Sequence, residues 1–152
     1  MAKNIHIIGI GGIGTSSLGQ ILNEKGNNIS GSDYKKSELI NIMIEKGIKI
    51  NIGHKQKNID KKTDLVIYSP AIEPENEELK YAKELNIKTL SYPEALGEFS
   101  KEYYTIAIAG THGKSTTASM LSVIMNNASL DPTVVVGTKI KQLSNKNYLT
   151  GK

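Results

Sequence analysis

The triplet Gly-Lys-Ser at residues 113–115 is the part of the sequence best suited to bind a nucleoside triphosphate. It lies in the stretch IAIAGTHGKSTTASML (106–121), where an apolar run leads through glycines into a helix-forming segment. Backbone N–H groups of such a loop can surround phosphates, the Lys114 ammonium can reach the terminal phosphates, and the Ser115 hydroxyl can bind Mg²⁺. We therefore predict an ATP site, with Mg²⁺ at Ser115, formed by Gly110, Thr111, His112, Gly113, Lys114, Ser115 and Thr116.

This loop departs from the standard P-loop at one position. The standard form, G-x-x-x-x-G-K-[ST], has a glycine where this chain has Ile108. We expect Gly110 to take over that role from a position closer to the lysine. His112 could contact a phosphate or a substrate, or it could face solvent, and the sequence leaves both options open.

A second glycine-rich stretch, GIGGIG (9–14), matches the pattern G-x-G-x-x-G between an apolar run and a helical segment. Its glycines allow a tight turn and a close approach to a diphosphate at a helix N-terminus. Asp33, about twenty residues further on, could accept hydrogen bonds from a ribose or a base. Alone, this pattern predicts NAD or FAD binding. In the plainer alternative the glycines only pack a helix on a strand, Asp33 caps a turn, and Ser69 ends a strand before Pro70.

Strand and helix patterns alternate along the chain and must position both loops. We predict a parallel sheet with helices on both faces, a Rossmann-like α/β fold, because short β-branched runs alternate with amphipathic segments. Ligands of such sheets bind outside the carboxyl ends of the strands. The predicted strands are 5–10, 29–32, 49–52, 65–69, 88–90, 105–109 and 133–136, and the predicted helices are 15–25, 37–46, 75–85, 93–99 and 114–126.

The pattern restarts near residue 100. We predict a complete first domain over 1–100 and, over 101–152, the beginning of a second α/β domain of the P-loop ATPase type. Its strands would be parallel and would lack sheet partners, so we expect this part to pack on a neighbouring chain, giving a homo-oligomer, or to be mobile. The tail from Lys139 is polar, and we expect it to bury little.

Composition excludes several classes of protein. There is no cysteine, no apolar run long enough to span a bilayer and no secretory signal, which indicates a cytoplasmic protein without disulfides or a membrane partner. The net charge is +4, yet every basic residue except histidine is a lysine dispersed among acids, so we do not expect nucleic-acid binding. We expect His6 in the core and His54 in a loop, with no carboxylate partner that would make a metal site.

Taken together, GIGGIG (9–14), GSD (31–33), AGTHGKSTT (109–117) and DPTVVVG (131–137) resemble the Mur ligases, the ATP-dependent enzymes that build the peptide stem of peptidoglycan. Within that family the chain is most similar to the member that joins L-alanine to UDP-N-acetylmuramate. The resemblance covers nearly the whole chain but only about the first third of such an enzyme. We therefore expect a shortened form of a longer protein that is inactive alone.

The resemblance implies a purpose for two phosphate loops. The first domain of the family holds the UDP part of a sugar nucleotide instead of NAD, and the second holds ATP. ATP phosphorylates the muramate carboxylate, and the amine of alanine displaces phosphate from the acyl phosphate. By analogy Lys114 is catalytic, and the substrate site comprises Gly9, Gly11, Gly12, Ile13, Gly14, Asp33, Ser69 and, on the side of the second domain, Gly137.

Three alternatives remain open at this point. One is the related ligase that recycles murein peptides, whose loop also carries the histidine. Another is an NAD-dependent oxidoreductase domain, which would not need the second loop. The third is a nucleotide-sensing module without catalysis. The amino-acid acceptor rests on family likeness alone.

Overall fold

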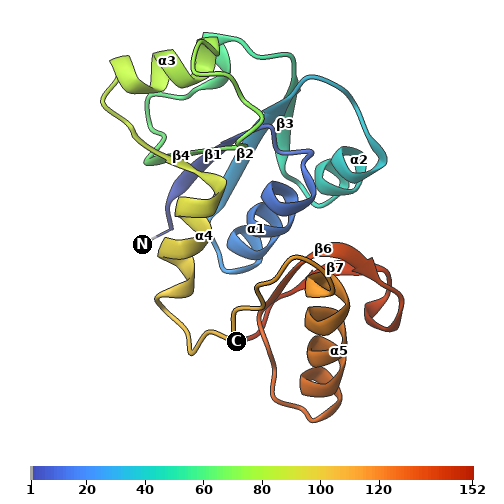
Figure 1. Cartoon of the computed structure of the whole chain (residues 1–152). Helices are drawn as coiled ribbons and strands as arrows, with labels where there is room; N and C mark the ends of the chain where they lie inside the picture. The colour runs from blue at the N-terminus through green and yellow to red at the C-terminus, as the bar shows by residue number, and fades with distance from the viewer. Residues whose placement is uncertain (1) are drawn as a thin grey trace.

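Five short apolar runs form a parallel sheet in the computed structural model, which describes residues 2–152. Figure 1 shows this sheet with its helices, and its strand order is β3-β2-β1-β4-β5. All neighbouring strands in it run parallel, which confirms the predicted sheet. The strands are β1 (Asn4–Ile8), β2 (Asn28–Asp33), β3 (Lys49–Ile52), β4 (Leu65–Tyr68) and β5 (Lys88–Ser91).

Helices cover both faces of the sheet, as the alternating pattern predicts. On one face, Ile5 and Ile7 of β1 pack in a core with residues of α1 (Ile13–Glu24), α2 (Glu38–Glu45) and α4 (Tyr92–Ser100). On the other face, Ile8 packs with residues of α3 (Glu77–Glu84). The 3-10 turn η1 (Gln56–Asn58) contacts α3 on that same side. Successive side chains of a strand point to opposite faces, so His6 faces α3.

The predicted strand over 105–109 is wrong. These residues are not in a strand, and most of them are exposed, with Ile106 at 52% and the preceding Tyr104 at 97%. A strand needs a neighbour to accept and donate its backbone hydrogen bonds. None of the residues 2–152 pairs with this stretch, which explains why its β-branched and apolar composition is not enough.

The end of the chain is more ordered than its polar composition indicates. After α5 (Lys114–Asn127), β6 (Val134–Ile140) pairs with β7 (Lys146–Leu149) through the 3-10 turn η2 (Lys141–Leu143). The pairing is antiparallel, so the expectation of unpaired parallel strands is wrong here. The expectation that the tail buries little is also wrong, because Asn147 is 7% and Tyr148 4% exposed.

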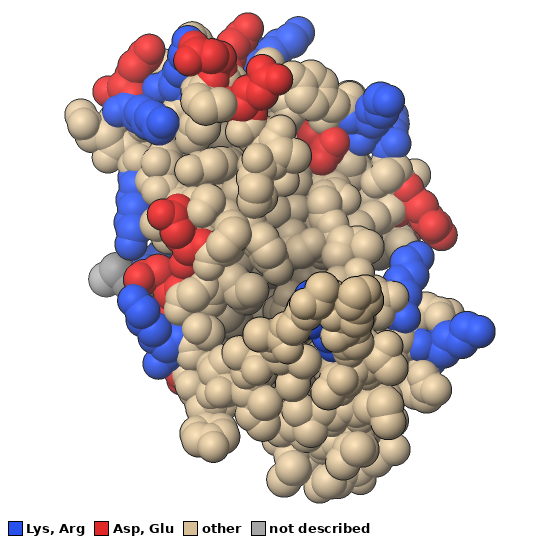
Figure 2. All heavy atoms as spheres, in the orientation of Figure 1, with Lys and Arg blue, Asp and Glu red and all other residues tan. Residues whose placement is uncertain are grey.

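The β6–β7 hairpin lies between α1 and α5 of the same chain (Figure 1). Its valines pack against Ala118 and Val123 of α5, while β7 contacts α1. The hairpin thus packs on its own chain, and packing of this part on a neighbouring chain stays a prediction. Figure 2 shows that charged side chains gather near α3 and along the edges, whereas the part of the surface formed by α5 is mostly uncharged.

Candidate functional site

The first glycine-rich loop turns over the carboxyl end of the sheet. The Gly9 and Ile10 N–H groups both donate to the Ser32 carbonyl at the end of β2, at 2.8 and 3.1 Å. Gly9 has φ +76°, and a Cβ there would lie 2.9 Å from the Ser69 Cβ, which follows β4. The structure thus brings Gly9, Asp33 and Ser69 together, as the rule for the ends of parallel strands predicts.

Asp33 holds the loop in shape. Its Oδ2 accepts a hydrogen bond from the Gly11 N–H at 2.8 Å, and a Cβ on Gly11 would lie 2.8 Å from that same oxygen. The Thr15 hydroxyl donates to the Gly9 carbonyl at 2.7 Å and closes the loop from the other side. The alternative role of Asp33, as a residue that supports a turn, therefore has a clear structural basis. Its contact with uridine stays a prediction.

The two helices that follow glycine-rich loops begin differently from the other helices. α1 begins after Gly12 and α5 after Gly113, in each case with no side-chain cap and no acidic residue in the first turn. In contrast, Ser37 caps α2, Asn76 caps α3 and Glu94 accepts from the Ser91 N–H at the start of α4. The first N–H groups of α1 and α5 thus keep their capacity to bind an anion.

The second glycine-rich loop is exposed along residues 109–117. Gly110 and Gly113 both have positive φ, of +147° and +76°. The Lys114 ammonium donates to the carbonyls of Gly110 and Thr111, at 2.6 and 3.2 Å. These carbonyls hold the ammonium against its own loop. His112 is exposed, and its role stays a prediction.

The hairpin connects the two loops. A Cβ on Gly137 of β6 would lie 4.0 Å from the Ser115 hydroxyl at the start of α5. On the other side of the hairpin, the Asn147 side-chain amide donates to the Ile13 carbonyl at 3.1 Å and to the Ser17 hydroxyl at 2.6 Å. Gly137 therefore lies beside the second loop, while Asn147 supports the helix that begins at the first. Sequence reasoning missed Asn147.

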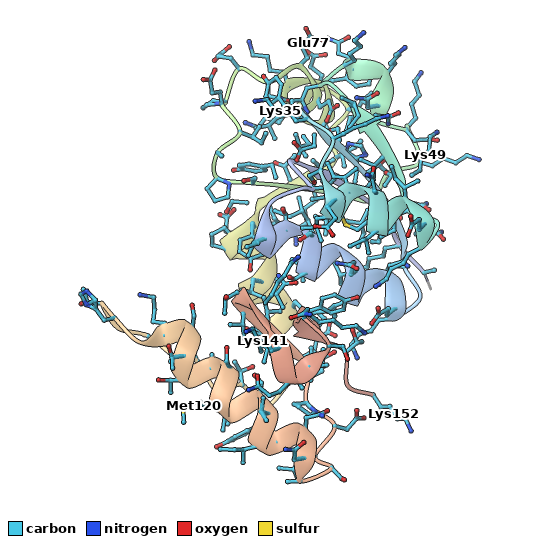
Figure 3. All side chains as sticks on the ribbon, turned by 90° about the vertical axis from the view of Figure 1, so that its right-hand side faces the viewer. Lys35, Lys49, Glu77, Met120, Lys141 and Lys152 are labelled. Atoms are coloured by element: carbon cyan, nitrogen blue, oxygen red, sulfur yellow. The ribbon has the colours of Figure 1, made fainter. Side chains whose placement is uncertain are left out.

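A pocket of about 250 Å³ lies beside the first loop. It connects to the loop through Ile72, whose Cδ1 would lie 3.4 Å from a Cβ on Gly9, and through Tyr34, which directly follows Asp33. Figure 3 shows the labelled Lys35 and Glu77 at this end of the molecule, far from Met120 of α5. The lining residues are Tyr34, His54, Ala71, Ile72, Glu73, Glu75, Asn76 and Glu77.

Behind this pocket lies a buried carboxylate that the sequence did not reveal. Both Glu78 oxygens accept hydrogen bonds: Oε2 from the Ser32 hydroxyl at 2.5 Å, and Oε1 from the Asn58 amide at 2.5 Å and from the Lys55 N–H at 3.1 Å. The His6 Nε2 lies 3.4 Å and the His54 Nδ1 3.6 Å from Oε2. Burial raises the pKa of Glu78, but hydrogen bonds from His6, Ser32 and Asn58 outweigh burial and hold that pKa below its usual value.

The two histidines therefore do share a carboxylate partner, contrary to expectation. His6 is buried in β1, as expected, and His54 lies in the loop after β3 with its side chain 5% exposed. Sequence reasoning missed the partnership because Glu78 lies far from both histidines in the chain and comes from another element. Nonetheless, none of the residues 2–152 form a group of three or more potential metal ligands. Within the same residues, no helix combines the length and apolar character needed to cross a membrane.

The parallel sheet with helices on both faces, and two uncapped helix starts after glycine-rich loops, define an α/β protein with two candidate anion sites. A family model described as "Mur ligase family, catalytic domain" matches residues 4–104, and the chain belongs to the Mur ligase family. The chain is 52% identical over 136 residues to a UDP-N-acetylmuramate–L-alanine ligase of Clostridium kluyveri, covering 89% of this chain and 30% of that protein. It is 50% identical over 149 residues to the Campylobacter jejuni ligase of the same name, covering 97% and 33%.

Solved structures agree with this assignment. A crystal structure of UDP-N-acetylmuramate–alanine ligase from Thermotoga maritima superimposes with a TM-score of 0.90 at 30% identity, over 97% of this chain and 35% of that one. A murein peptide ligase from Psychrobacter arcticus gives a TM-score of 0.89 at 26% identity, over 99% and 34%. The chain thus spans about a third of the length of the relatives that it matches.

Proposed function

We propose that the chain is the nucleotide-binding part of a ligase that joins L-alanine to UDP-N-acetylmuramate at the expense of ATP. Residues 1–100 hold the UDP-sugar, and residues 101–152 begin the unit that binds ATP. One observation carries this proposal: the chain has two helices that begin uncapped after glycine-rich loops, in a family whose relatives carry that ligase name. Two such anion sites suit two nucleotides, and the reaction has two nucleotide substrates, UDP-N-acetylmuramate and ATP.

The residues present fit the expected roles. The diphosphate lies against Gly11, Gly12 and Ile13 at the start of α1, whose first turn contains no acidic residue. The Gly11 N–H already donates to the Asp33 carboxylate, which fixes the shape of the loop. Lys114 approaches the terminal phosphates, since its ammonium already lies over the loop carbonyls. Ser115 is exposed, and its hydroxyl is assigned to Mg²⁺, which would neutralise phosphate charge when bound.

In the proposed reaction a carboxylate oxygen of the muramate attacks the terminal phosphorus of ATP and ADP leaves. The alanine amine then attacks the acyl phosphate, phosphate leaves, and an amide forms. Lys114 stabilises the negative charge of the phosphoryl group during the first step. We expect the 152-residue chain to bind nucleotides in the cytoplasm but not to complete this reaction, because it spans only about a third of its relatives.

Calorimetry with four ligands tests the proposal. We expect UDP-N-acetylmuramate to bind with micromolar or weaker affinity, Mg-ATP to bind separately, NAD to show no heat of binding, and ATP hydrolysis to be negligible. Lys114→Ala should weaken ATP binding by about tenfold or more, because a hydrogen bond to a charged group is lost, and should leave UDP-N-acetylmuramate unaffected. Lys101→Ala, at an exposed lysine, is the control. Binding of NAD without UDP-N-acetylmuramate would instead support an oxidoreductase domain.

The recycling ligase for murein peptides is the second candidate. The superposition on a murein peptide ligase is nearly as good as that on the alanine-adding enzyme. The names and identities of the curated relatives favour alanine addition. The discriminating experiment is an amide-forming assay on the longer protein that contains this sequence, with L-alanine and a murein tripeptide as competing acceptors.

A further inference from the structure

His54 carries a buried side-chain atom that lacks a hydrogen-bond partner. Its side chain is 5% exposed, and its Nε2 is the one such atom found among residues 2–152. The opposite ring nitrogen, Nδ1, lies 3.0 Å from the Ser32 hydroxyl. Buried polar atoms are normally paired. Because His54 lines a pocket, its unpaired Nε2 is a candidate hydrogen-bond partner for a ligand that displaces the atoms now covering it.

The pocket beside His54 has the size and position of a subsite. Its volume of about 250 Å³ is below the roughly 300–1,000 Å³ typical of a drug-sized ligand, so it suits one ring of a larger molecule. The Tyr34 ring packs edge-to-face on the His54 ring with centroids 4.5 Å apart. Because the pocket adjoins the first loop through Ile72, a nucleotide with its diphosphate on that loop can place its base here.

The proton on the His54 ring is fixed by Glu78 through Ser32. Both Glu78 oxygens face hydrogen-bond donors, as an ionised carboxylate requires. The Ser32 hydroxyl has one proton and gives it to Glu78 Oε2, at 2.5 Å. The Ser32 oxygen therefore has only lone pairs to offer His54, so Nδ1 carries the proton of the neutral ring and Nε2 is left as an acceptor.

We propose that Glu78, acting through Ser32, is a positioning residue that makes His54 Nε2 the hydrogen-bond acceptor for the ring N–H of a uracil base in this pocket. This inference rests on the proposed function, because it places the UDP base beside the first loop. Uracil has an N–H between its two carbonyl groups, whereas cytosine has an unprotonated nitrogen at the same ring position. An acceptor on the protein therefore favours uracil over cytosine.

The substitution Glu78→Gln reverses this arrangement with little change of shape. The oxygen of the introduced amide would face Asn58 and the Lys55 N–H, which both donate, so its NH₂ group would face Ser32. Ser32 would then accept from this NH₂ group and donate to His54 Nδ1. The ring proton would move to Nε2, and the preference for uracil would disappear.

The test combines ring nitrogen NMR with calorimetry on the 152-residue chain at about pH 8.5, where an ordinary imidazole is neutral. We expect His54 to carry its proton on Nδ1 in the unmodified chain and on Nε2 in Glu78→Gln. We expect UDP to bind about tenfold or more tightly than CDP in the unmodified chain, and this ratio to fall to about one in Glu78→Gln and in His54→Ala. Glu84→Gln, at an exposed position of the same helix, should change neither readout.

The outcomes separate this inference from the proposed function. A proton on Nε2 in the unmodified chain, or a UDP to CDP ratio that Glu78→Gln leaves unchanged, overturns the inference while UDP binding still supports the proposed function. Absence of UDP binding with the proton on Nδ1 overturns the proposed function and, with it, the role of the base. The tautomer and the ratio of the unmodified chain require no variant, so poor folding of Glu78→Gln does not leave the question undecided.

Discussion

The two glycine-rich loops have similar sequences but different surroundings. The first is held from outside by the Asp33 carboxylate and the Thr15 hydroxyl, and Gly14 is so closely packed that a Cβ would lie 2.5 Å from Tyr92. In contrast, the second is exposed, and a Cβ on Gly113 would meet nothing within 4 Å. Similar glycine-rich sequences thus form a closely packed turn in one place and an open loop in the other.

This difference follows from the sheet. The first loop joins β1, which has a strand on each side, to a helix covered on two sides. The stretch before the second loop has no strand neighbour among the described residues. Local sequence therefore sets the conformation of both loops, but only tertiary contacts make the first one rigid. A ligand that binds the second loop has to order that loop, and this ordering reduces the binding free energy.

The test with the largest expected effect on stability compares Gly9 and Gly113, which have the same φ of +76°. Gly9→Ala combines backbone strain with a clash against the Ser69 Cβ, and we expect it to lower the free energy of unfolding by about 3 kcal/mol. Gly113→Ala adds the strain alone, and we expect about 1 kcal/mol. Urea denaturation followed by circular dichroism measures both. Equal losses would show that tertiary contacts at Gly9 add nothing, and the comparison would fail.

A smaller effect is expected where the hairpin supports the first loop. Asn147→Ala removes the hydrogen bonds to the Ile13 carbonyl and the Ser17 hydroxyl, and we expect a loss of about 1–2 kcal/mol. Amide hydrogen exchange should become faster in the first turn of α1. Asn126→Ala, at an exposed position of α5, is the matched control. If exchange in α1 stays unchanged, the hairpin is not what makes the first loop rigid.

The sequence predicted the parts of the molecule that depend on local patterns. The five parallel strands and both glycine turns depend on residues close in the chain, and the structure confirms the strands within a few positions. The stretch 105–109 failed because strand formation requires a neighbour, which composition does not report. β7 was missed because its buried residues, Asn147 and Tyr148, are polar and are held by hydrogen bonds to α1.

The candidate site divides in the same way. The proximity of Gly9, Asp33 and Ser69 could be predicted from the sequence, since the ends of parallel strands meet at one edge. The network around Glu78 could not, because its members come from β1, β2, α3 and the loop after β3. α1 shows a related limit: polar Ser17 and Gln20 are buried where Asn147 and Tyr148 of the hairpin bond to them.

The smallest expected effect is the difference in how low pH changes the stability of the two regions. A carboxylate whose folded pKa is lowered, as for Glu78, stabilises the fold fully above its unfolded pKa of about 4.3, and this contribution is lost as pH falls through the folded pKa. The free energy of unfolding of the first region should therefore decrease below about pH 5, and less steeply in Glu78→Gln than in the unmodified chain or in Glu84→Gln. Residues 105–152 contain one acidic residue, Asp131, so the helix content of α5 should respond less. Denaturation curves from pH 7 downward, with residue-resolved NMR intensities for α3 and α5, measure both. If the NMR intensities of α5 decline more steeply with falling pH than those of α3, the first region is not the more acid-sensitive one.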